Sequence, residues 1–101
     1  MAMKCAAEGR ELTVAISGEV DHHAAREILT QLERHISAVM PRSLTLDLGG
    51  VTFMDSSGIA VVVRAKLRMD DLGGRVRVCS APPQARRVLS MAGLERMVRF
   101  E

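Results

Sequence analysis

The amino-acid sequence predicts a single α/β domain, residues 1–101, in which a mixed β-sheet begins with an antiparallel hairpin and helices pack on the sheet. Short segments of alternating apolar residues indicate strands, and longer segments with apolar residues three or four positions apart indicate helices. After the first two strands, the two kinds of segment alternate. The length of 101 residues lets one domain bury roughly two-thirds of its unfolded surface.

The first half of the chain is predicted to form a hairpin followed by a helix. Residues 3–7 and 12–16 alternate as strands do, and Glu8-Gly9-Arg10 between them has the composition of a tight turn. Asp21 is a suitable N-cap for the next segment, which Pro41 ends. The apolar face of this helix is predicted to consist of Ile28, Leu32, Ile36 and Val39.

A second strand–helix unit follows. Residues 44–48 indicate a strand, and residues 57–71 are predicted to form a helix that stops before Gly73-Gly74. The apolar positions of this helix are expected to be Ile59, Val62, Val63 and Leu67.

The last part of the chain predicts strand, helix and strand. Val76 and Val78 alternate with arginines, and residues 97–100 read as a final short strand. A helix starts around Pro82-Pro83, because proline is tolerated in a first turn, and ends at Gly93. Its apolar face is predicted from Ala85, Val88, Leu89 and Ala92. The order is β-β-α-β-α-β-α-β, so the strands after the hairpin are expected to run parallel with right-handed crossovers.

Composition disfavours several classes of function. The chain has no Trp or Tyr and a net charge of only +2, with its basic residues interspersed among acids, so we expect no nucleic-acid partner. No apolar run approaches the roughly 18 residues that a membrane span needs. Cys5 and Cys79 lie far apart and the N-terminus has no signal-peptide pattern, so we expect free buried thiols and a cytoplasmic protein.

The segment Asp55-Ser56-Ser57-Gly58 concentrates polar groups between a strand and a helix. Ser56 is a candidate N-cap, because its hydroxyl can accept a hydrogen bond from an amide of the first turn. The same segment also leaves an open, polar helix start, which suits a kinase or a protein partner. The residues alone leave both interpretations open.

The stretch from Val51 to Ile59, Val-Thr-Phe-Met-Asp-Ser-Ser-Gly-Ile, resembles the signature of the anti-sigma-factor antagonists, the bacterial STAS-domain proteins. Gly18-Glu19-Val20-Asp21-His22-His23 is similar to the Gly-Glu-Leu-Asp-His-His segment of the sporulation branch of that family, and residues 91–94 and 98–101 resemble its later portion. The resemblance covers nearly the whole chain and implies a STAS-like fold. The family is expected to continue with a further helix where this chain stops at Glu101.

The resemblance implies a regulatory binding module rather than an enzyme, with no cofactor. The unphosphorylated form binds an anti-sigma factor that is also a serine kinase and carries the ATP, and so releases the sigma factor. Phosphorylation on Ser56 switches this binding off, and a serine phosphatase reverses it. The free chain is expected to be a monomer. The residues expected at the partner surface are Glu19, Asp21, His22, Asp55, Ser56, Ser57 and Gly58.

A phosphate on Ser56 is expected to act outward rather than to unfold the domain. It carries about −1.5 to −2 charges, and it would face free amides and the positive end of the helix dipole. Gly58 is expected to leave space for its oxygens. At about 6 Å from a partner carboxylate, an effective dielectric near ~20 gives roughly 3 kcal/mol of repulsion per charge. Even if screening halves this value, a dianion lowers affinity ~100-fold.

Asp21 has two possible roles. As an N-cap alone it would contribute ~1 kcal/mol. The chain order also allows the loop after the second strand to lie beside Ser56 on one edge of the sheet. Asp21, flanked by Glu19 and His22, would then offer its charge to a basic residue of the partner.

Other site chemistries fit the sequence poorly. The histidines and cysteines lack zinc-ligand spacing, so no metal is expected, and no glycine-rich phosphate loop is present. A serine hydrolase would need glycine two residues before the nucleophile, where this chain has Met54, although His22 could serve as a base. Asp47 ends a strand as a phospho-accepting aspartate does, but it lacks the acidic pair that binds magnesium.

An accessory STAS subunit of a membrane transporter is the other alternative, since it would use the same fold as a docking piece. Ser56 favours the sigma switch, because the position can be phosphorylated. The small serine hydrolase is the weakest of the three interpretations.

Overall fold

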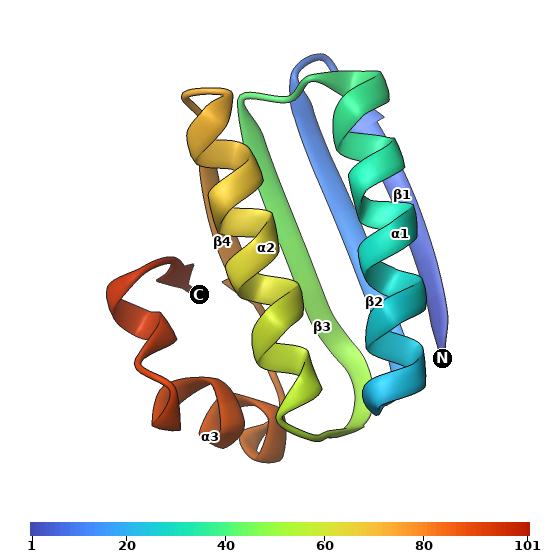
Figure 1. The fold of residues 1–101 in the computed structure, drawn as a ribbon, viewed down its shortest axis with the longest axis vertical. Helices are drawn as coiled ribbons and strands as arrows, with labels where there is room; N and C mark the ends of the chain where they lie inside the picture. Colours follow the sequence, from blue (N-terminus) through green and yellow to red (C-terminus); the bar gives the residue numbers. More distant parts are fainter.

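The computed structural model describes residues 1–101 and confirms the predicted order of strands and helices (Figure 1). The chain forms an α/β domain with a five-stranded mixed sheet and three α-helices. In chain order the elements are β1 (Ala2–Glu8), β2 (Glu11–Val20), α1 (His22–Val39), β3 (Ser43–Met54), α2 (Ser57–Asp71), β4 (Arg75–Cys79), α3 (Pro83–Met91), the 3₁₀ turn η1 (Leu94–Arg96) and β5 (Arg99–Phe100).

The strands lie in the sheet in their chain order, β1-β2-β3-β4-β5. β1 runs antiparallel to β2, and every later neighbour pair is parallel, as predicted. Helices α1 and α2 lie side by side over one face of the sheet, and α3 lies near the C-terminal end of β3 (Figure 1). The opposite face, which we call the open face, carries polar and small side chains such as Lys4, Thr13, Asp47, Arg75 and Arg77.

The core is aliphatic and lies between the sheet and the two long helices. Alternate residues of β2 and β3 point into it, and Val14, Leu44 and Leu46 are completely buried. The predicted face of α1 is confirmed at Ile28, Leu32 and Ile36, whereas Val39 is half-buried. The one buried polar side chain is Thr45, and its Oγ1 accepts a hydrogen bond of 2.8 Å from Nε of Arg77.

β3 is longer than the predicted strand over residues 44–48. It continues to Met54, because Gly50 and Val51 still pair with β2 across a register shift. Gly50 lets the two backbones approach there, because a side chain on Gly50 would collide with Ser17. The last strand is shorter than predicted, since the chain is still turning at Met97 and only Arg99–Phe100 pair with β4.

The predicted apolar face of α2 is partly wrong. Leu67 is 54% exposed, and Ile59 and Val63 are half-buried. The buried residues are Gly58, Val61, Val62, Ala65 and Met69. The helix is apolar on more than one side, so spacing alone fitted two faces, and the small residues at 58 and 65 mark the one that lies against the sheet. Similarly, Ala92 on the predicted face of α3 is exposed.

Replacement of Met69 by alanine is expected to destabilise the domain by about 2–5 kcal/mol, because this fully buried side chain would leave a cavity. Leu67→Ala on the same helix is the matched control and is expected to change the free energy of unfolding by less than about 1 kcal/mol. Urea unfolding of both variants measures the difference. Equal losses would show that the helix faces are assigned wrongly.

Candidate functional site

The loops after β2 and β3 lie side by side, as expected from the chain order. Val20 is the register partner of Met54, and the amide of Asp55 donates to the carbonyl of Val20 at 3.1 Å. The carboxyl ends of two parallel strands therefore meet at one edge of the sheet, with Asp21 beginning one loop and Ser56 in the other. This edge is the candidate functional site.

Asp55, not Ser56, stabilises the start of α2. Oδ1 of Asp55 accepts a hydrogen bond of 2.8 Å from the amide of Ser57, and its carbonyl accepts one of 3.1 Å from Gly58. Ser56 already has helical backbone angles, φ −62° and ψ −16°, and makes no side-chain capping bond. Ser56 therefore occupies the N-cap position, but the predicted capping bond of its hydroxyl is absent, because a capping side chain needs an extended backbone to aim at the first turn. The Ser56 side chain is exposed and free.

The residues after Ser56 lie progressively deeper. Ser57 is half-buried, and Gly58 is buried. A Cβ on Gly58 would collide with the side chain of Met54, so the missing side chain serves the packing of helix on strand. The prediction that Gly58 leaves space for the phosphate oxygens is therefore wrong, because the Met54 side chain fills that space on the core side of the turn.

Gln84 fixes the end of β3 from the other side, and the sequence interpretation missed it. Its Oε1 accepts from the amide of Met54 at 2.8 Å, and its Nε2 donates to the carbonyl of Met54 at 2.7 Å. β4 pairs with β3 only as far as Asp47, so Gln84 supplies here the two hydrogen bonds that a neighbouring strand would make. No local pattern marks such a residue, because the contact spans 30 positions of the chain.

Asp21 is the N-cap of α1, as one of its two predicted roles required. Its Oδ1 accepts a hydrogen bond of 2.8 Å from the amide of Ala24. Asp21, Glu19 and His22 are all exposed beside the Ser56 loop. Glu19 is the register partner of Phe53, which is 46% exposed although it is one of only two Phe, Tyr or Trp residues in the chain.

An apolar groove adjoins Ser56. The hollow has a volume of about 290 Å³ and is lined by Ser56, Ile59, Val88, Met91 and Ala92. Met91 is 83% exposed, more than any other large apolar side chain in the chain. The sequence interpretation placed Val88 and Ala92 on the core side of their helix. Val88 is half-buried and packs against the core, whereas Ala92, which follows the end of α3 at Met91, is exposed.

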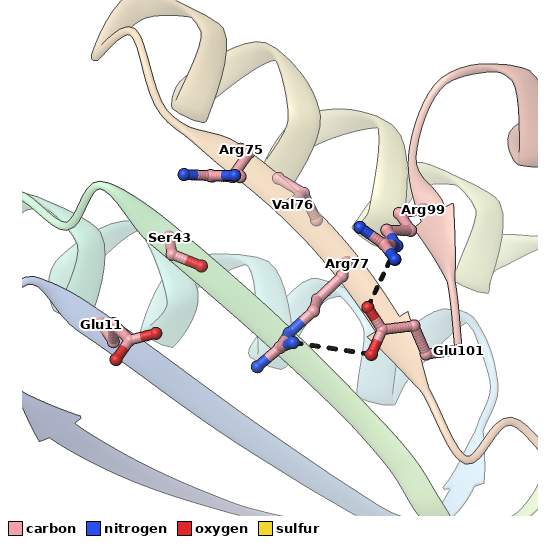
Figure 2. A pocket seen from close by; sticks show the side chains of 7 residues that line it. All are labelled: Glu11, Ser43, Arg75, Val76, Arg77, Arg99 and Glu101. Atoms are coloured by element: carbon pink, nitrogen blue, oxygen red, sulfur yellow. Dashed lines mark hydrogen bonds and ion pairs between the residues drawn. The ribbon is translucent and has the colours of Figure 1, made fainter.

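A second hollow, of about 330 Å³, lies on the open face at the opposite end of the parallel strands (Figure 2). Glu101 forms ion pairs there with Arg77 at 3.5 Å and with Arg99 at 3.2 Å. The side chain of Arg75 points away from these two ion pairs (Figure 2). This hollow brings together charged side chains, but neither a nucleophile nor a general base that the sequence had suggested.

Possible metal ligands and the two thiols are scattered over the structure. No three His, Cys, Asp or Glu side chains are grouped closely enough to hold a metal ion. Cys5 and Cys79 are free and half-buried, on strands that β2 and β3 separate. Burial raises the pKa of the Cys5 thiol, so it stays protonated at neutral pH.

Comparison with known proteins defines the family. The family model of the STAS domain matches residues 4–101. An anti-sigma F factor antagonist of Paenibacillus polymyxa is 35% identical over 82% of this chain and 71% of its own length. The unphosphorylated anti-sigma factor antagonist SpoIIAA has the same fold, with a TM-score of 0.86 over 99% of this chain and 88% of that chain at 23% identity. A SulP transporter STAS domain from Vibrio cholerae gives a TM-score of 0.64 at 26% identity, over 86% and 70% of the two chains.

The chain therefore belongs to the STAS domain family, and its curated relatives place it with the anti-sigma factor antagonists. None of its helices is long and apolar enough to cross a bilayer.

Substitution of Gln84 by methionine keeps the length of the side chain but removes both hydrogen bonds to Met54. The half-buried amide and carbonyl of Met54 would lose their partners, and we expect a loss of about 1–3 kcal/mol in the free energy of unfolding. Exchange of the Met54 amide should also accelerate. Arg87→Met, an exposed position on the same helix, is the control. Slow exchange in Gln84→Met would show that Gln84 does not hold this strand end.

Proposed function

We propose that this protein is a cytoplasmic anti-sigma factor antagonist controlled by phosphorylation of Ser56. The observation that carries the proposal is the state of the Ser56 hydroxyl, which is exposed and makes no capping bond on a turn whose backbone is fixed by Asp55 and Gln84. A kinase can reach such a hydroxyl without opening the fold. The antagonist relatives support the same role.

Ser56 is a better acceptor than Ser57. Ser57 is half-buried, and its amide is bonded to the Asp55 carboxylate at 2.8 Å. Modification of Ser57 would bring a dianion towards that carboxylate. A phosphate on Ser56 instead extends into solvent at the start of α2, where the helix dipole favours an anion. The amides of Ser57, Gly58 and Ile59 already have partners within the turn, so they are not free to bind the phosphate as the sequence had suggested.

The partner is proposed to be an anti-sigma factor that is also a serine kinase and binds the ATP, and a serine phosphatase regenerates the active form. The unphosphorylated antagonist holds the kinase and so frees the sigma factor. The groove beside Ser56 supplies apolar contact through Met91 and Ile59. On the other side of Ser56, Asp21 and Glu19 offer negative charge to basic residues of the partner. A phosphate between these two contact areas repels carboxylates of the partner, and this repulsion lowers the affinity ~100-fold.

A transporter accessory subunit is the second candidate, since the STAS domain of a SulP transporter has the same fold. The exposed serine and the apolar groove next to it favour the kinase partner. Co-purification separates the two: a small ATP-binding kinase supports the switch, and a transporter or its ATPase supports the alternative.

Incubation with the cognate kinase and ATP is expected to place one phosphate on Ser56, located by peptide mass mapping. Ser56→Ala should remain unmodified and bind the kinase continuously, while Ser57→Ala, the matched control, should still be phosphorylated. Ser56→Asp should weaken binding by roughly tenfold or more, since it carries one charge rather than two. A phosphate on Ser57, or full binding by the phosphorylated protein, would contradict the proposal.

A further inference from the structure

The outer edge of β1 is an open strand edge. β1 is the first strand of the sheet and lies beyond α1 at its border, with a partner on one side only (Figure 1). It is seven residues long, and Ala6, Ala7 and Glu8 are exposed. The other edge strand, β5, has only two residues. An edge of this length presents unpaired N–H and C=O groups that can pair with another strand.

The charges on β1 have no partners in the monomer. Lys4 and Glu8 are exposed on the open face, and neither belongs to any of the five ion pairs of the structure. Glu8 is also the register partner of Glu11, so two carboxylates lie directly opposite each other. Like charges in that position destabilise a strand pair unless a cation joins them. The nearest acid along the row of Lys4 is Asp47, which lies beyond β2.

The hairpin fixes which backbone groups point outward. Glu8 and Glu11 close a two-residue turn at Gly9 and Arg10, with Gly9 at φ +62°. The closing pair of such a turn is hydrogen-bonded, and bonding alternates along an antiparallel ladder. Even-numbered residues of β1 therefore bond to β2, and Met3, Cys5 and Ala7 present their amides and carbonyls to the open edge.

We propose that two copies of this chain associate through β1, antiparallel about a two-fold axis at Ala6. Cys5 and Ala7 then exchange backbone bonds with Ala7 and Cys5 of the second copy. In this register Lys4 lies opposite Glu8 of the second copy, twice per dimer. Each lysine then adds a cation beside Glu8 and Glu11 of the second copy, neither of which belongs to an ion pair of the structure. The partner at this edge is a second copy of the chain rather than a foreign peptide, because Lys4 and Glu8 of one copy complement Glu8 and Lys4 of the other.

Other registers lose this complementarity. An axis at Cys5 places Lys4 opposite Ala6, and an axis at Lys4 places two lysines face to face. Under this proposal the chain forms a weak, salt-sensitive dimer in place of the expected monomer. β1 is two strands away from β3, so both Ser56 sites stay exposed, and the dimer is independent of the proposed switch.

Cysteine cross-linking tests the register directly. At the axis, Ala6 faces Ala6 of the second copy as a non-hydrogen-bonded pair, with Cα atoms about 4.5 Å apart, which suits a disulfide. In the full chain with Cys5→Ala and Cys79→Ser, Ala6→Cys should give mostly linked dimer on mild oxidation. Ala2→Cys, also at an exposed position of the same strand, reports chance collision and should stay mostly monomeric.

Charge reversal provides the second arm, measured by sedimentation velocity with circular dichroism to check folding. Lys4→Glu and Glu8→Lys should each raise the dimer dissociation constant by roughly tenfold, because two pairs change sign. The double variant should restore it, and Arg96→Glu, an exposed position far from β1, should leave it unchanged. A wild-type protein that stays monomeric at ~1 mM, an Ala6→Cys yield equal to that of Ala2→Cys, or no rescue by the double variant would overturn the proposal.

Discussion

The pairing of β3 is the constraint on which the rest of the structure depends. Its first half is held on both sides by β2 and β4 and supplies the completely buried Leu44 and Leu46 to the core. Its second half extends beyond β4, where β2 holds one side and the amide group of Gln84 holds the other. The Ser56 turn begins two residues after this double anchor. The position of the turn is therefore fixed by the sheet.

A fixed turn suits a switch that works by charge. The carboxylate of Asp55 accepts the hydrogen bond of the first-turn amide of Ser57, and the Ser56 hydroxyl makes no capping bond. Modification of that hydroxyl removes no intramolecular bond, and the helix start tolerates an anion. The added charge instead changes the surface around Ser56, where the Met91 groove lies on one side and Asp21 lies on the other. The two surfaces that we propose, one at Ser56 and one at β1, lie on different parts of the sheet and can act separately.

Much of this arrangement could be predicted from the sequence, because strand alternation and helix spacing are local. The order of elements, the parallel sheet, the cap at Asp21 and the meeting of the two loops all followed from local pattern and chain order. The Gln84 anchor could not be predicted, since it depends on where α3 lies in space. The Met91 groove was missed because apolar spacing does not tell a core face from an exposed one. The missing capping bond of Ser56 could not be predicted, because side-chain type does not reveal backbone angles.

The central claim is that phosphate on Ser56 changes the surface and leaves the fold in place. Amide hydrogen exchange across residues 54–71, with and without the phosphate, tests it most directly. We expect the same protection in both forms, because the helix is held by buried residues such as Val62 and Met69, each worth about 1.5–3 kcal/mol. Partner affinity should nevertheless fall ~100-fold. Faster exchange throughout α2 in the phosphorylated form would show a conformational switch and contradict the account.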